Sequence, residues 1–88
     1  MVNRLQGKRT IVPGGSSGIG RAICKLFASE GASLVIADID NDGGQETLNE
    51  VLDDKGTAVF VHTDVSNAAV LKTLYRRLLI SWGGLMFL

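Results

Sequence analysis

The sequence predicts an α/β fold in which a parallel sheet carries helices on both faces. Short β-rich runs alternate with stretches of helical periodicity, in the order β-α-β-α-β-α-β. One β-rich run, Ser33–Asp38 (SLVIAD), is almost continuously apolar, which is typical of a strand covered on both faces. The last β-rich run begins just before the final residue, Leu88, so we expect a sheet that is truncated in its fourth strand.

The first half of the chain predicts two strands joined by a helix. Arg9–Val12 is the first strand and Ser33–Asp38 the second. Between them, apolar residues recur at helical spacing, and Gly31 is expected to end the helix. The apolar stripe of this helix consists of Ile19, Ala22, Ile23, Leu26 and Phe27.

A turn and a more polar helix are predicted next. The segment Asn41–Gly44 (NDGG) is expected to turn the chain, and the helix that follows ends at Gly56. Its buried side is predicted to consist of Leu48, Val51 and Leu52.

The final elements are a third strand, a third helix and the start of a fourth strand. Ala58–His62 is the strand, and Ser66 is the expected N-cap of the helix. Gly83 and Gly84 break this helix, and Leu85–Leu88 begins the fourth strand. The apolar stripe of the third helix consists of Leu71, Leu74, Tyr75, Leu78 and Trp82.

Composition limits the class of protein. The 88 residues make one small domain or part of a larger one, and nine basic residues balance nine acidic ones. This balance gives no electrostatic footprint for nucleic acid or for an anionic membrane. The single cysteine, Cys24, cannot form an internal disulfide, and His62 lacks the partners of a metal site. With no apolar run near the ~20 residues that span a bilayer, we expect a soluble, cytoplasmic protein.

A glycine cluster follows the first predicted strand, with the spacing G-x-x-x-G-x-G. Gly14 would allow a tight turn, Gly18 a close approach of backbone to a ligand, and Gly20 close packing of the helix on the sheet. The N-terminus of the helix suits a pyrophosphate, and Ser16 and Ser17 add hydroxyl donors. The alternative is a glycine-rich turn that holds no ligand.

Asp38 ends the second predicted strand, 18 residues after Gly20. A carboxylate near this spacing accepts hydrogen bonds from the adenosine ribose and repels a 2′-phosphate, which favours NAD(H) over NADP(H). Ile39 follows, so no arginine stands there to receive that phosphate. Asp38 could instead cap a helix or hold a turn, and we expect Arg21 to be a solvated residue rather than a phosphate ligand.

Several segments together resemble the N-terminal third of a short-chain dehydrogenase/reductase: GGSSGIG, ADID, HTDVS and WGGLMFL, each at its expected place among the strands. The resemblance implies a Rossmann-type fold, with residues 1–88 forming a partial dinucleotide-binding domain. It also implies hydride transfer between NAD(H) or NADP(H) and a small-molecule alcohol or carbonyl. The matching positions are Gly14, Ser17, Gly18, Ile19 and Gly20 for the pyrophosphate loop, Asp38 for the ribose, and Asp64 and Val65 for the adenine pocket.

Two positions depart from the family pattern. Pro13 stands where a threonine is usual, which removes a backbone N–H and a hydroxyl. Its fixed φ suits a strand end, so we expect a weakened cofactor site rather than a destroyed one. Met86 replaces a polar residue at the entry to the fourth strand.

The family's catalytic serine and Tyr-x-x-x-Lys pair do not occur in the 88 residues. Tyr75 is followed by Leu79 instead of a lysine four positions later, so we expect Tyr75 to serve packing. We therefore expect a cofactor-binding portion that does not catalyse the family reaction alone. The alternatives are a nucleotide-binding module without a redox role and a truncated, non-catalytic product that associates through its open sheet edge. That edge also predicts self-association.

Overall fold

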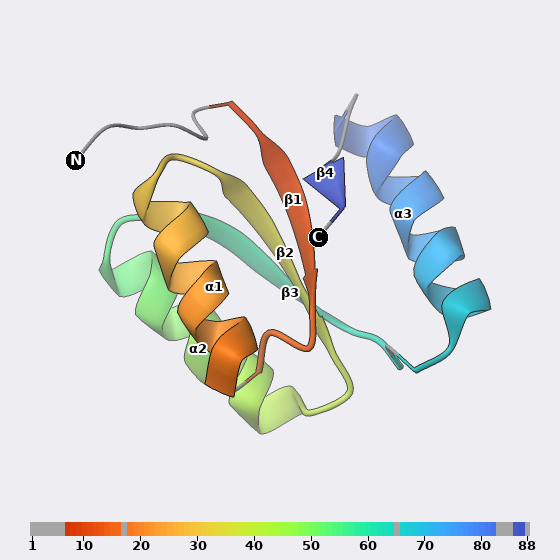
Figure 1. Ribbon diagram of the computed structural model, residues 1–88, viewed down its shortest axis with the longest axis horizontal. Coiled ribbons are helices and arrows are strands. Elements are labelled where there is room, and N and C mark those ends of the chain that lie inside the picture. The colour runs from red at the N-terminus through yellow and green to blue at the C-terminus, as the bar shows by residue number, and fades with distance from the viewer. Residues whose placement is uncertain (1–6, 17, 65, 83–85, 88) are drawn as a thin grey trace.

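The computed structural model describes residues 7–16, 18–64, 66–82 and 86–87. Strands and helices alternate along the chain in the predicted order (Figure 1). The elements are β1 (Arg9–Pro13), α1 (Gly18–Ser29), β2 (Ser33–Asp38), α2 (Asn41–Asp53), β3 (Thr57–His62), α3 (Ala68–Trp82) and β4 (Met86–Phe87).

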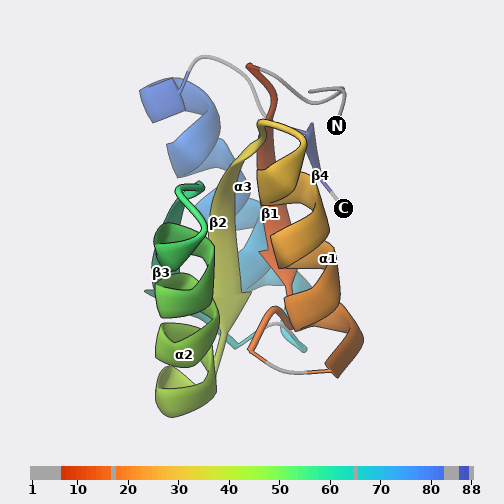
Figure 2. The same ribbon diagram turned by 90° about the vertical axis from the view of Figure 1, so that its left-hand side faces the viewer.

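The four strands form one parallel sheet in the order β3-β2-β1-β4. Strand β2 pairs along its whole length with β3, from Ser33 opposite Thr57 to Asp38 opposite His62. Helices α1 and α2 lie side by side on one face, and α3 covers the other (Figures 1 and 2). The predicted fold class is confirmed, and the carboxyl ends of β1, β2 and β3 meet at the same edge of the sheet.

The core has two layers, one on each face of the sheet. Alternate residues of the strands enter each layer, as the period of two requires. Leu34 and Ile36 pack under α1 and α2, whereas Val35 packs under α3 with Leu74 and Tyr75. The prediction that Tyr75 serves packing is therefore confirmed.

The predicted apolar stripe of α1 is only half buried. Ile23 and Phe27 pack against the core, but Ala22 is exposed and the exposed fractions of Ile19 and Leu26 are 80% and 52%. Among the described elements, α1 contacts the sheet and α2. The part of the stripe that faces neither of them, which includes Ile19 and Leu26, is exposed. In the same way, α2 buries Val51 and packs Leu48 against the core but leaves Leu52 exposed.

The expected turn at Asn41–Gly44 is wrong, because these residues form the first turn of α2. Asp40 is the N-cap, and its Oδ1 accepts the Gly43 N–H at 3.0 Å. A Cβ at Gly44 would overlap the ring of Phe60 on β3. Glycine is therefore required here by the close approach of a helix to a strand, and the cap overrides its poor helix propensity.

Two predicted helix ends are also corrected. The side chain of Asn67, one residue after Ser66, caps α3 by accepting the N–H groups of Ala69 and Val70. At the end of α2, the left-handed residue is Lys55 (φ 65°), not Gly56. The predicted break at Gly83 and Gly84 lies outside the described residues, as do the side chains of Leu71, Leu78 and Trp82.

Candidate functional site

The glycine cluster forms the turn between β1 and α1. Pro13 is the last residue of β1, as its fixed φ allows, and the next residue, Gly14, donates its N–H to the Ala37 carbonyl at 2.8 Å. Gly14 has a φ of 73°, which favours glycine and turns the chain out of the strand. A Cβ at Gly20 would overlap the Gly14 carbonyl oxygen. The closest partner of Gly20 is thus the turn itself, not the sheet on which we expected it to pack.

Gly18 is the first residue of α1 and follows the glycine turn. Its φ is 58°, and a Cβ built there would meet no atom within 4 Å. The first N–H groups of a helix lack partners within the helix and carry a partial positive charge. The space beside Gly18 therefore adjoins a helix terminus that suits an anion.

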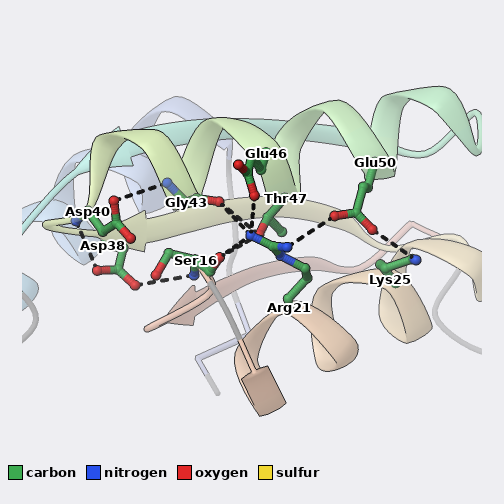
Figure 3. Close-up of polar contacts among 9 residues, drawn as sticks. All are labelled: Ser16, Arg21, Lys25, Asp38, Asp40, Gly43, Glu46, Thr47 and Glu50. Atoms are coloured by element: carbon green, nitrogen blue, oxygen red, sulfur yellow. Dashed lines mark hydrogen bonds and ion pairs between the residues drawn. The ribbon is translucent and has the colours of Figure 1, made fainter.

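The Asp38 carboxylate lies at the end of β2 and joins the glycine turn to the start of α2. Its Oδ2 accepts the Ser16 N–H at 3.2 Å, and its Oδ1 accepts the Asp40 N–H at 3.1 Å (Figure 3). Burial acts to raise the pKa of Asp38, but hydrogen bonds from Ser16 and Asp40 outweigh it and lower the pKa below the ordinary 3.8. Asp38 is therefore an anion at neutral pH. Asp40, not Asp38, caps the helix.

Arg21 is not the solvated side chain that the sequence led us to expect. Its Nε donates to the Thr47 hydroxyl at 2.9 Å, and its Nη2 donates to the carbonyls of Ser16 at 2.5 Å and Gly43 at 3.2 Å (Figure 3). Three-quarters of its side chain is buried. Arg21 therefore links the glycine turn and α1 to α2 instead of projecting toward a ligand.

Two carboxylates of α2 complete this link. Arg21 forms ion pairs with both, at 3.2 Å from Nη2 to Glu46 Oε2 and 3.3 Å from Nη1 to Glu50 Oε2. Lys25 Nζ lies 3.1 Å from Glu50 Oε1. Sequence reasoning missed Glu46, Thr47 and Glu50. A signal existed, because basic residues four apart in α1 match acidic residues four apart in α2. Like charges at this spacing destabilise an isolated helix, so each pair indicates an oppositely charged neighbour.

Asp64 follows β3 at the same edge of the sheet. The N–H of Thr63 donates to the Asp38 carbonyl at 2.8 Å, which ties this segment to the end of β2. Asp64 itself is exposed and accepts the hydroxyl and N–H of Ser66 at 2.6 and 3.0 Å, and these bonds lower its pKa. Ser17 and Val65, two other predicted site residues, lie outside the described residues.

The remaining candidate groups do not join this site. Cys24 is buried, and burial raises the pKa of its thiol to about 11, which leaves it unreactive. His62 ends β3, and its Nδ1 lies 2.8 Å from Asn41 Oδ1. In the described part of the chain, no three His, Cys, Asp or Glu residues gather as a metal site would require. No helix there has the length and apolar character needed to cross a bilayer.

A cleft of about 350 Å³ opens between the end of β3 and α3, with Val61, Thr63, Leu74 and Arg77 among its lining residues. None of the predicted site residues that the structure describes lines this cleft. The structure thus brings together Gly14, Ser16, Gly18, Gly20 and Asp38 at the carboxyl edge of β1 and β2, away from this cleft.

A family model described as short chain dehydrogenase matches residues 8–88. The chain is 38% identical over 85 residues to the 2,5-dichloro-2,5-cyclohexadiene-1,4-diol dehydrogenase LinX of Sphingobium indicum, a match that covers 97% of this chain and 34% of that enzyme. It is 40% identical over 82 residues to the 3-beta-hydroxysteroid dehydrogenase of Comamonas testosteroni, covering 89% of this chain and 31% of that one. The chain spans about a third of the length of these curated relatives.

Solved structures agree with the family match. The citronellol catabolism dehydrogenase (AtuB) of Pseudomonas aeruginosa PAO1 superimposes with a TM-score of 0.87 at 28% identity, over 97% of this chain and 36% of that one. A 7 alpha-hydroxysteroid dehydrogenase, solved in complex with NADH and 7-oxo glycochenodeoxycholic acid, gives 0.84 at 31% identity, over 94% of this chain and 32% of that one. The glycine turn, the sheet order and these matches together show that the chain belongs to the short-chain dehydrogenase family.

Proposed function

We propose that these residues bind the adenosine diphosphate half of NAD(H), as the cofactor-binding portion of an oxidoreductase that interconverts alcohols and carbonyl compounds. The family binds NAD(H) or NADP(H) and small-molecule substrates. The observation that carries the proposal is the meeting of the glycine turn and the Asp38 carboxylate at the ends of β1 and β2. In open α/β sheets, ligands bind at the carboxyl ends of the strands.

The residues present fit such a cofactor. The open space at Gly18, beside the N-terminus of α1, suits a pyrophosphate because backbone N–H groups and the helix dipole favour an anion there. Asp38 is ionised, so it acts only as an acceptor, which is the state that receives hydrogen bonds from ribose hydroxyls. When bound, the nicotinamide cofactor supplies the hydride donor or acceptor of the reaction, while the chain's own residues bind and orient its adenosine end.

The charges near Asp38 favour NAD(H) over NADP(H). A 2′-phosphate would lie close to the Asp38 anion, and the next residues are Ile39 and a second carboxylate, Asp40. Arg21 is already engaged by Glu46 and by backbone carbonyls, so it does not offset this repulsion. We therefore assign Asp38 the role of excluding the 2′-phosphate.

Calorimetric titration with two probes tests this proposal. ADP-ribose carries the adenosine diphosphate half of NAD, and 2′-phospho-ADP-ribose carries that of NADP. We expect ADP-ribose to bind more tightly, and Asp38→Ala to narrow the difference because it removes the repelling charge. Equal binding of both probes by the unchanged chain would contradict the role of Asp38. Absence of ADP-ribose binding would contradict the proposed function.

A second candidate function is association through the sheet edge. Strand β4 lies at one end of the described strand order and pairs only with β1 there, by Thr10 opposite Met86 and Ile11 opposite Phe87. An apolar edge strand of this kind is a template for pairing with another chain. This observation favours self-association of the 88-residue chain, which light scattering measures directly.

A further inference from the structure

The backbone of Ser16 is held through both of its polar groups. Its N–H donates to the Asp38 carboxylate at 3.2 Å, and its carbonyl accepts Arg21 Nη2 at 2.5 Å and the Thr47 hydroxyl at 3.2 Å. The three partners come from β2, α1 and α2 respectively. The backbone of a single residue in the glycine turn is therefore fixed, at its N–H and at its carbonyl, by three separate elements of the fold.

Arg21 and Thr47 form one unit in this arrangement. Arg21 Nε donates to the Thr47 hydroxyl at 2.9 Å, and both side chains also reach the Gly43 carbonyl at 3.2 Å. Thr47 is fully buried. The guanidinium has donors in a rigid fork, so one side chain can span the glycine turn and the first turn of α2 at once.

The same first turn of α2 is linked to Asp38. Asp40 caps it by accepting the Gly43 N–H at 3.0 Å, and the Asp40 N–H donates to Asp38 Oδ1 at 3.1 Å. The Asp38 carboxylate thus lies between two groups, the Ser16 peptide and the Asp40 peptide, whose flanking segments Arg21 holds together. Movement of either segment would displace a hydrogen-bond donor of Asp38.

We propose that Arg21, with Thr47, positions the dinucleotide site by fixing the backbone of Ser16, and with it the place of the Asp38 carboxylate beside the glycine turn. This inference rests on the proposed function. Arg21 is a positioning residue, since its donors are engaged by Thr47, by two backbone carbonyls and by Glu46 and Glu50. Its role is to restrict where the ribose acceptor lies, not to contact the cofactor.

Four variants separate positioning from general stability. Arg21→Met removes every donor while keeping the long side chain, and Arg21→Lys restores the charge without the fork. Thr47→Val removes the shared hydroxyl at similar volume. Lys25→Met is the matched control, because it breaks an ion pair between the same two helices without touching Ser16 or Gly43. Thermal melts establish that each variant is folded at the titration temperature.

Titration with ADP-ribose gives the main readout. We expect Arg21→Met to raise the Kd about tenfold, because hydrogen bonds to charged groups that hold the site are lost. Thr47→Val should raise the Kd by a smaller factor, Arg21→Lys should recover part of the affinity, and Lys25→Met should leave it within about twofold, as expected of an exposed ion pair. Equal effects of Arg21→Met and Lys25→Met would overturn the inference. If Arg21→Met is unfolded, an unchanged Kd for Thr47→Val overturns it instead.

Hydrogen exchange of the Ser16 amide, followed by NMR without ligand, distinguishes this inference from the proposed function. Faster exchange in Arg21→Met than in Lys25→Met is expected, because the Ser16 carbonyl loses a donor that helps to keep the Ser16 N–H beside Asp38. Unchanged exchange would overturn the inference even where ADP-ribose binds. If the unchanged chain binds no ADP-ribose, the proposed function fails, and the exchange result alone decides whether Arg21 fixes the backbone of Ser16.

Discussion

Replacing Gly20 by alanine should destabilise the chain although it improves helix propensity. The added Cβ would overlap the Gly14 carbonyl oxygen and lie 2.8 Å from the Gly14 carbonyl carbon and 3.0 Å from Gly15 Cα. All three contacts are backbone atoms, so the start of α1 must move away from the turn. Overpacking of this kind costs about 1–3 kcal/mol, and rigid backbone neighbours favour the upper end.

The net effect follows from two opposing contributions. Alanine in a helix is about 1 kcal/mol more favourable than glycine. Taking about 3 kcal/mol for the overlap leaves a net loss of ~2 kcal/mol in the free energy of unfolding. For a domain of this size, that lowers the Tm by roughly 8–16 °C, at ~4–8 °C per kcal/mol. Urea denaturation followed by circular dichroism measures the difference.

Gly18 provides the matched control within the same motif. A Cβ there meets no atom within 4 Å, but its φ of 58° is unfavourable for alanine by about 1–2 kcal/mol. Gly18→Asn should be milder than Gly18→Ala, because asparagine tolerates the left-handed conformation, whereas Gly20→Asn should be at least as damaging as Gly20→Ala. If Gly20→Ala is as stable as the unchanged chain or more so, the close approach to Gly14 is refuted.

Four further results are expected. Because the pKa of Asp38 is lowered on folding, its contribution to stability is complete above its unfolded pKa of 3.8 and is lost as the pH falls further, so acid titration should destabilise the unchanged chain more steeply than Asp38→Asn. The buried thiol of Cys24, with a pKa of about 11, should resist alkylation at pH ~8 until denaturant is added; rapid labelling of the folded chain would contradict its burial. The purified 88-residue chain should not reduce NAD with any alcohol, because the family's acid/base tyrosine and lysine pair does not occur in it; turnover free of host dehydrogenases would contradict this. Light scattering should detect self-association that two lysines added after Leu88 reduce, whereas a monodisperse monomer would contradict the role of the β4 edge.

The parallel sheet and the order of its strands and helices along the chain could be predicted because they depend on patterns that the sequence carries locally. The apolar run of β2 matches its observed bounds, Ser33–Asp38, and the alternation of strands with helices implies a parallel sheet. The start of α2 could not be read this way, because Asn41–Gly44 has the composition of a turn. Its helical state depends on the Asp40 cap and on Phe60, which is distant in the sequence.

Some residues of the candidate site could likewise be predicted from the sequence, and others could not. The glycine spacing and Asp38 could be recognised in the sequence, since the glycines follow the first predicted strand and Asp38 ends the second. The contacts of Arg21 could not, because they depend on how closely α1 approaches α2. Side-chain hydrogen bonds to backbone carbonyls, such as that from Arg21 to Ser16, leave no sequence pattern of their own. Only the complementary charges on the two helices pointed toward the link.

The close approach of Gly44 to Phe60 also bears on the order in which the chain folds. Two adjacent glycines in its first turn make α2 a weak helix in isolation, at a cost of about 1 kcal/mol each relative to alanine. The Phe60 ring, which packs on Gly44, follows that residue by 16 positions. During synthesis, therefore, the first turn of α2 gains its contact with Phe60 only after β3 has left the ribosome, so we expect this turn to become stable no earlier than β3.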